Sequence, residues 1–127
     1  MIHFDTNVLI ALPQWARASH PTIRRIVAGE PAAVCSVVWY EFLIGPIDAA
    51  EIDLARAFLQ GRIQPIDDED ATLAAQLFND CGRRRTLKTD ALIAASAIRA
   101  NAELATVNVA DFEPFANHGL RLLRAAK

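Results

Sequence analysis

The chain has 127 residues, which is enough for one domain with its own hydrophobic core, and its 53% hydrophobic content excludes a disordered protein. No apolar run approaches the roughly 20 residues of a membrane-spanning helix, and the N-terminus carries no recognisable signal peptide. Thirteen basic and fifteen acidic residues give a net charge of −2, so a nucleic-acid partner would need a local basic patch or a bound cation.

The first half of the chain alternates apolar runs of strand length with helical patterns. Residues 2–4 predict a buried strand, after which Asp5, Thr6 and Asn7 begin a short helix. The further elements expected here are a helix over residues 21–28, a buried strand over 32–38, a short helix over 39–44 and an amphipathic helix over 48–60.

The second half continues the alternation. Pro65 indicates that the strand around it lies at the edge of the sheet or that the proline stands at the end of the strand, and Asp90 stands directly before an alanine-rich helical pattern. We expect strands over residues 62–66, 104–107 and 120–123, and helices over 71–81 and 91–100. Strands that alternate with helices in this way predict an α/β fold with a mostly parallel sheet, in a single domain that covers residues 1–127.

Acidic side chains are predicted to gather at one edge of this sheet. Parallel strands share one C-terminal edge, and ligands bind in the crevice outside it. Asp5 ends the first strand, Glu41 lies shortly after the second, and Asn108 and Asp111 follow a later one. Asp90 begins a helix that runs back antiparallel to the strand it precedes, so it reaches the same edge. The prediction is a crevice surrounded by carboxylates, although each acid alone is also compatible with a helix cap or a surface position.

Carboxylates that lie a few ångströms apart repel one another and need protonation, a cationic side chain or a divalent cation. Oxygen ligands without Cys or His favour Mg²⁺ or Mn²⁺ over zinc, and such ions activate water and neutralise charge on a phosphodiester. The pattern therefore predicts metal-dependent hydrolysis of a phosphate ester. Thr6 and Ser36 are candidates for holding a carboxylate or the attacking water, and Asn7 for positioning Asp5; a local cap or turn bond is an equally good interpretation of each.

Four motifs that span nearly the whole chain resemble those of PIN-domain ribonucleases of the VapC toxin type. They are Phe-Asp-Thr-Asn-Val-Leu-Ile at residues 4–10, Trp-Tyr-Glu-Phe-Leu-Ile-Gly at 39–45, Thr-Asp-Ala-Leu-Ile-Ala-Ala at 89–95 and Thr-Val-Asn-Val-Ala-Asp-Phe at 106–112. The resemblance implies a three-layer α/β/α fold and a Mg²⁺-dependent, cytoplasmic endoribonuclease. It also implies that the chain forms a homodimer and acts as the toxin of a toxin–antitoxin pair, held inactive by its antitoxin.

The resemblance assigns the catalytic site to Asp5, Glu41 and Asp90, with Asp5 and Asp90 as ligands of Mg²⁺, for which Mn²⁺ can substitute. The sequence departs from the family at the fourth acidic position, where Asn108 stands in place of an aspartate. Asp111, three residues later, is then the candidate fourth carboxylate. Asn108 is a candidate metal or water ligand through its amide oxygen.

One concentrated basic segment lies just before Asp90 and is made of Arg83, Arg84, Arg85 and Lys88. Contacts from such residues to an RNA backbone would add salt-dependent affinity without sequence preference. The alternative interpretation is a solvated helix end, where cations are favourable in any protein.

Two other functions compete with the nuclease. A PIN-like scaffold that binds RNA or protein but has lost cleavage is favoured by Asn108. An Asp-based phosphatase of the haloacid-dehalogenase type is suggested faintly by Asp5 together with Asp67 and Asp68, but the position two residues after Asp5 is Asn7 rather than a second aspartate. Cys35 and Cys81 are isolated in the sequence and predict reduced thiols in a cytoplasmic protein.

Overall fold

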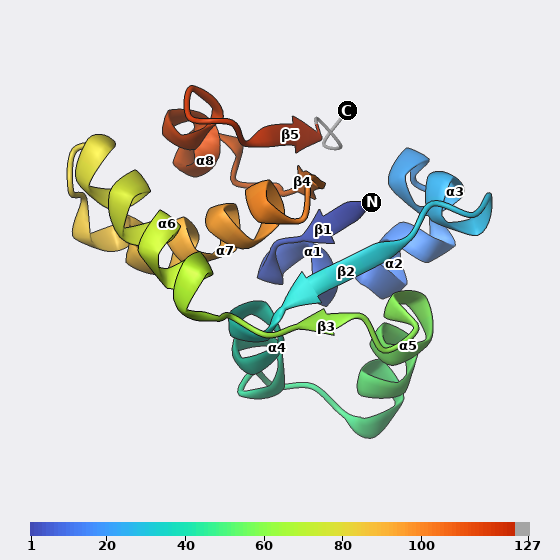
Figure 1. Ribbon diagram of the computed structural model, residues 1–127. Coiled ribbons are helices and arrows are strands. Elements are labelled where there is room, and N and C mark those ends of the chain that lie inside the picture. Colours follow the sequence, from blue (N-terminus) through green and yellow to red (C-terminus); the bar gives the residue numbers. More distant parts are fainter. Residues whose placement is uncertain (124–127) are drawn as a thin grey trace.

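The computed structural model describes residues 1–123, in which five strands form a single sheet flanked by helices (Figure 1). The strands are β1 (Ile2–Phe4), β2 (Ala32–Cys35), β3 (Ile63–Gln64), β4 (Glu103–Ala105) and β5 (Arg121–Leu123). The helices are α1 (Thr6–Ile10), α2 (Leu12–Arg17), α3 (Pro21–Val27), α4 (Ser36–Leu43), α5 (Ala49–Leu59), α6 (Asp68–Asp80), α7 (Lys88–Arg99) and α8 (Val109–Ala116), with a 3-10 turn, η1 (Arg85–Leu87), before α7.

The sheet has the strand order β3-β2-β1-β4-β5, and all four pairings are parallel. The central strand β1 is completely buried, as its apolar sequence predicts, and Ile2 faces Ala32 on one side and Glu103 on the other. The short edge strand β3 is followed directly by Pro65, which confirms the edge position predicted from that proline.

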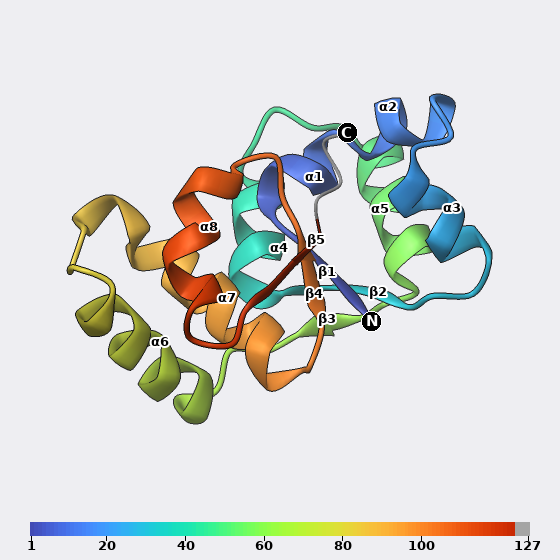
Figure 2. The same cartoon turned by 90° about the horizontal axis from the view of Figure 1, so that it is seen from above.

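Helices cover both faces of the sheet. Figure 2, in which the strands are seen between the helices, shows α6, α7 and α8 on one side and α2, α3 and α5 on the other. This arrangement confirms the predicted α/β fold with three layers. The chain leaves β1 toward β2, whereas β4 adds on the opposite side of β1. The order of the strands therefore reverses between β1 and β4, the position where open α/β sheets form a ligand crevice.

The second strand is shorter than its sequence predicts. The apolar run over residues 32–38 was expected to be one strand, but β2 ends at Cys35 and Ser36 begins α4, with Val38 fully buried in the helix. A short apolar run cannot be assigned to strand or buried helix by periodicity alone, which explains the error. As a result, Glu41 is the sixth residue of α4 and lies in its second turn.

Three further differences concern helices. No helix was predicted over residues 12–17, but α2 forms there, with Pro13 in its first turn, where proline is well tolerated. Asp90 was expected to precede its helix but is the third residue of α7. The helix α8 was not predicted at all. Among residues 1–123 no helix is both long and apolar enough to cross a membrane, and Cys35 and Cys81 are free thiols.

Candidate active site

The carboxylate of Asp5 is fixed at the point where the strand order reverses. Asp5 follows β1, and its backbone N–H donates to the carbonyl of Ala105 at the end of β4 (3.0 Å). Its Oδ1 accepts from the backbone N–H of Thr6 (2.8 Å), which makes Asp5 the N-cap of α1. Its Oδ2 accepts from the hydroxyl of Thr106 (2.9 Å). Asp5 is only 5% exposed, so both oxygens are held with little freedom.

Thr106 is a site residue that the sequence analysis missed. It is completely buried; its hydroxyl donates to Asp5 and accepts from the backbone N–H of Asn108 (2.9 Å). The sheet register explains the contact, because Phe4 pairs with Ala105 and the residues that follow, Asp5 and Thr106, leave the sheet side by side. The register, once known, would have identified Thr106, whereas its spacing in the sequence would not.

Glu41 reaches the same edge from α4, which packs against α1. The hydroxyl of Thr6, the first residue of α1, donates to Oε1 of Glu41 (2.5 Å). Thr6 therefore bonds Asp5 through its backbone and Glu41 through its side chain. This contact agrees with the predicted role of Thr6 in holding a carboxylate.

Asp90 and Asp111 lie in the first turns of α7 and α8, and both are partly buried. Burial, and then the charges of Asp5, Asp111 and Glu41, raise the pKa of Asp90 to about 6. Burial likewise raises the pKa of Asp5, against the opposing effect of its bonds to Thr106 and Thr6, and the charges of Glu41 and Asp111 raise it further. The four carboxylates thus share one electrostatic environment, and we call them the crevice acids.

The crevice acids repel one another, and no cationic side chain of residues 1–123 is paired with them. In the part of the chain that the structure describes, no ion pair involves Asp5, Glu41, Asp90 or Asp111. An all-oxygen, multiply charged donor set fits Mg²⁺ or Mn²⁺ in chemistry and in charge. As they are placed, however, no three Asp, Glu, His or Cys side chains of residues 1–123 form a group that could hold one metal ion. The carboxylate oxygens are therefore ligands that Mg²⁺ prefers, but they do not converge on one position where a metal ion could bind.

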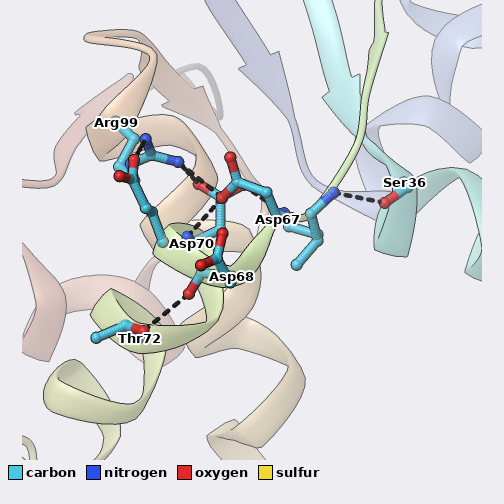
Figure 3. Close-up of polar contacts among 8 residues, drawn as sticks. Ser36, Asp67, Asp68, Asp70, Thr72 and Arg99 are labelled. Carbon is cyan, nitrogen blue, oxygen red and sulfur yellow. Dashed lines mark hydrogen bonds and ion pairs between the residues drawn. The ribbon is translucent and has the colours of Figure 1, made fainter.

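Within residues 1–123, the other three predicted supporting residues form no side-chain hydrogen bond to a crevice acid. Ser36 was expected beside the carboxylates, but its Oγ accepts from the backbone N–H of Ile66 (3.0 Å) and so fastens the segment before α6 (Figure 3). Asn7 is exposed on α1. Asn108 is exposed as well, and its backbone rather than its side chain bonds Thr106.

A second group of acids lies at the start of α6 and differs from the first. Asp67 and Asp70 form a capping box, and Arg99 donates from Nη1 to both of them (2.9 Å each) (Figure 3). Together with Met1 these residues line a cavity of about 400 Å³. Met1 precedes β1 and Asp5 follows it, so the two acid groups are separated by the strand, a rise of about 13 Å. Asp67 therefore serves as a helix cap, which removes the motive for pairing it with Asp5 in a phosphatase.

The predicted RNA-binding residues are all exposed at the join between α6 and α7. The guanidinium of Arg83 lies 5.5 Å from the centre of the Phe78 ring and also donates to Asn79. Within residues 1–123, none of the four basic residues forms an ion pair, in contrast to Arg99. Their charges are available to an anionic partner.

Comparison with known proteins was made by family model, by sequence and by structure. The family model of the PIN domain matches residues 2–114. Among solved structures, a toxin–antitoxin complex from Klebsiella pneumoniae has 27% sequence identity and a TM-score of 0.67, with 88% of this chain and 90% of that chain covered. VapBC2 from Rickettsia felis, bound to a DNA fragment from its promoter, has 21% identity and a TM-score of 0.75, with 97% and 98% covered. VapBC-1 from nontypeable Haemophilus influenzae has 20% identity and a TM-score of 0.66, with 100% of both chains covered. A search of curated proteins finds no match.

Proposed function

The chain belongs to the PIN-domain family, and from this premise we propose that it is a Mg²⁺-dependent endoribonuclease that acts as the toxin of a toxin–antitoxin pair. PIN domains are generally nucleases. The observation that carries the proposal is the set of crevice acids: four carboxylates at the topological switch point that form no ion pair with any cation of residues 1–123. Such an arrangement lowers the stability of the folded protein unless the site binds a cation during function.

Each residue of the site has a separate role in this proposal. Asp5 and Asp90 are the metal ligands, and Glu41 and Asp111 complete the catalytic group. A bound Mg²⁺ or Mn²⁺ supplies a lowered pKa for the attacking water and neutralises charge on the phosphodiester. Thr106 and Thr6 hold Asp5 and Glu41 in fixed orientations by their hydroxyl donations. The exposed amide of Asn108 is available to a metal ion or to water.

RNA as substrate is supported by the exposed basic segment Arg83, Arg84, Arg85 and Lys88. These residues immediately precede Asp90 along the chain, and α7 begins with Lys88 and contains Asp90 in its first turn. Phosphates bound here would lie at the end of α7 that carries Asp90. This supplies the local basic patch that a chain with a net charge of −2 requires.

The antitoxin partner is supported by the toxin–antitoxin complex from Klebsiella pneumoniae, which is similar to this chain over 88% of its length at 27% identity. We propose that the antitoxin inhibits by placing a basic side chain among the crevice acids, where opposite charge is strongly favoured. We also propose, from the family resemblance, that the toxin is a homodimer.

A scaffold that binds RNA without cleaving it is the second candidate. It is favoured by two observations: Asn108 replaces a carboxylate of the family pattern, and the acids among residues 1–123 are not gathered as a metal-binding group.

Cleavage of cellular RNA by the purified, antitoxin-free protein distinguishes the two candidates. The assay is run with Mg²⁺, with Mn²⁺ and with EDTA, beside the variant Asp5→Asn, which removes one charge while keeping the shape of the side chain. We expect cuts that need metal and disappear in the variant. RNA binding without cuts, together with no Mn²⁺ bound in calorimetry, would favour the scaffold instead.

A further inference from the structure

A slot between α6 and α7 has no role in the proposed chemistry. Its volume is about 300 Å³, at the lower end of the roughly 300–1,000 Å³ of small-ligand pockets. Its walls are small and apolar, formed by alanines of α6, among them Ala71 and Ala75, and by Ala91 and Leu92 of α7. Two helices that pack closely normally fill such space with larger side chains, so the alanines leave room for a flat group.

The mouth of the slot has a different character from its walls. Phe78, Asn79, Arg83 and Lys88 line it. The guanidinium of Arg83 is stacked over Phe78, 5.5 Å from the ring centre, and is held there by its bond to Asn79. An aromatic ring with a planar cation upon it is a surface on which nucleobases stack, and base stacking tolerates every base because each has a π-face.

The positively charged side chains around the slot favour an anionic ligand. Arg83 and Lys88 at the mouth, and Arg84 and Arg85 beside them, form no ion pair within residues 1–123. The N-terminus of α7 adds the positive end of its helix dipole to them, while the backbone N–H of Lys88 itself donates to the carbonyl of Arg85. The cavity beside Arg99 is the opposite case, since its cation is already bonded to three acids.

We propose that this slot binds one nucleotide of the single-stranded RNA substrate, on the helix that also carries Asp90. The base enters between the alanines and stacks at Phe78 and Arg83, and its phosphate lies at Lys88 and the first turn of α7. Lys88 and Asp90 are two residues apart in the first turn of α7, and their side chains point to different sides of the helix, so a strand that crosses this turn would connect the slot with the crevice acids. The inference rests on the proposed function and adds to it a base-binding subsite that discriminates single-stranded from paired RNA, because a paired base cannot enter the slot.

The test fills the slot without changing charge. Ala75 is exposed on α6, so Ala75→Leu is compatible with the helix and places a branched side chain in the slot. Ala50→Leu, exposed on α5, is the matched control. Binding of a short fluorescein-labelled oligoadenylate is measured by anisotropy in EDTA, over a range of salt concentrations. We expect Ala75→Leu to raise Kd about tenfold without altering the salt dependence, since one base stack is lost.

Lys88→Gln separates the phosphate contact from the base contact. We expect it to lower the slope of log Kd against log salt by about 0.7, as loss of one phosphate contact on a single strand requires. Equal Kd values for Ala75→Leu and Ala50→Leu would overturn the slot as a nucleotide subsite. So would a change in self-association of Ala75→Leu, measured by sedimentation, that leaves Kd unaltered, because the slot would then be a contact between copies of the chain.

The same variants separate this inference from the proposed function. With Mg²⁺, Ala75→Leu should raise KM for RNA about tenfold and leave kcat unchanged, because the crevice acids are untouched. If the parent protein cleaves RNA and Ala75→Leu has the same KM, the slot inference fails while the nuclease stands. If the parent protein neither binds nor cleaves RNA, both fail together.

Discussion

Two groups of acids in this protein lie in opposite electrostatic environments. At the start of α6, Asp67 and Asp70 form a capping box, and the guanidinium of Arg99 donates hydrogen bonds to both carboxylates. The bond from the Asp70 backbone, and then Arg99, hold the pKa of Asp67 below its ordinary value. Beyond β1 and β4, the crevice acids have hydroxyl and backbone donors but no cation of the described chain, and the pKa values of Asp5 and Asp90 are raised.

The difference shows which acids hold the fold together and which acids need something from outside it. Arg99 and the helix N-terminus neutralise the first group within the molecule, so its charges stabilise the native state. The second group reduces stability until an external cation arrives. Perturbed carboxylates in a crevice at a switch point are therefore candidates for function on physical grounds, independently of any family.

The largest expected effect separates the two groups directly. Asp90→Asn should lower the rate of RNA cleavage at least about a hundredfold, more than loss of an outer-shell partner of a metal site. Asp67→Ala should leave the rate unchanged but lower the free energy of unfolding by about 1 kcal/mol through loss of the N-cap. Cleavage assays and urea unfolding in EDTA measure the two quantities. If Asp67→Ala lost cleavage as well while remaining folded, the division between the groups would be wrong.

A smaller effect is expected from the residue that orients Asp5. Thr106→Val keeps the shape of the side chain and removes its hydroxyl, so Asp5 loses one of its two donors and Asn108 loses an acceptor. We expect cleavage to fall about tenfold. The pKa of Asp5 should rise further, which moves the acidic limb of the pH–rate profile upward. Thr106→Ser, which keeps the hydroxyl, is the control and should restore both; a variant profile identical to the parent would show that Thr106 only fills space.

The contrast between paired and unpaired charges extends to the cations. Arg84 and Arg85 are exposed and form no ion pair within residues 1–123. Replacing both with Gln should lower the slope of log Kd against log salt for single-stranded RNA by about 1.4, at about 0.7 for each phosphate contact. Arg17 and Arg24, exposed on α2 and α3, supply a control pair with the same change of net charge. An equal loss of slope in the control pair would mean that only total charge matters.

Sequence reasoning predicted the layers of the fold well and its element boundaries less well. The alternation of apolar runs and helical spacing was sufficient for a parallel α/β sheet, and Pro65 restricted its strand to an edge position or itself to a strand end, both of which the structure shows. The apolar run after Ala32 could not be divided correctly, because buried helix and buried strand have the same composition there. The strand order of the sheet was also beyond the sequence, since it depends on which long-range pairings form.

The candidate site shows the same division between local and long-range information. Two general rules predicted that the crevice acids share one edge. Parallel strands have a common C-terminal edge, and a helix antiparallel to the strand it precedes begins at that edge. The bond from Thr106 to Asp5 depends on the neighbouring positions of β1 and β4, which no local pattern contains. The bond that Ser36 accepts could not be foreseen for a similar reason: its partner, Ile66, follows β3, which pairs with β2.

The smallest expected effect is a pH dependence of stability that distinguishes Asp90 from Asp67. Because the pKa of Asp90 is raised from 3.8 to about 6, the folded protein holds this proton more tightly than the unfolded chain does. The contribution of Asp90 to the free energy of unfolding in EDTA should therefore fall as pH rises from about 4 to about 6, and Asp90→Asn should remove this contribution while that of Asp5, whose pKa is also raised, remains. The pKa of Asp67 is lowered, so its contribution is present above its ordinary pKa of 3.8 and is lost only as pH falls below it.

The measurement is the difference between the parent and each variant in urea unfolding across this pH range. The difference is needed because burial lowers the pKa of His3 to about 4, and His3 therefore makes stability rise with pH over an overlapping range in every variant. Suppose that the free energy of unfolding of the parent minus that of Asp90→Asn does not change between pH about 4 and about 6. The pKa of Asp90 would then not be raised by burial and the other acids. The crevice would then need no external cation, and the two acid groups would differ in position alone.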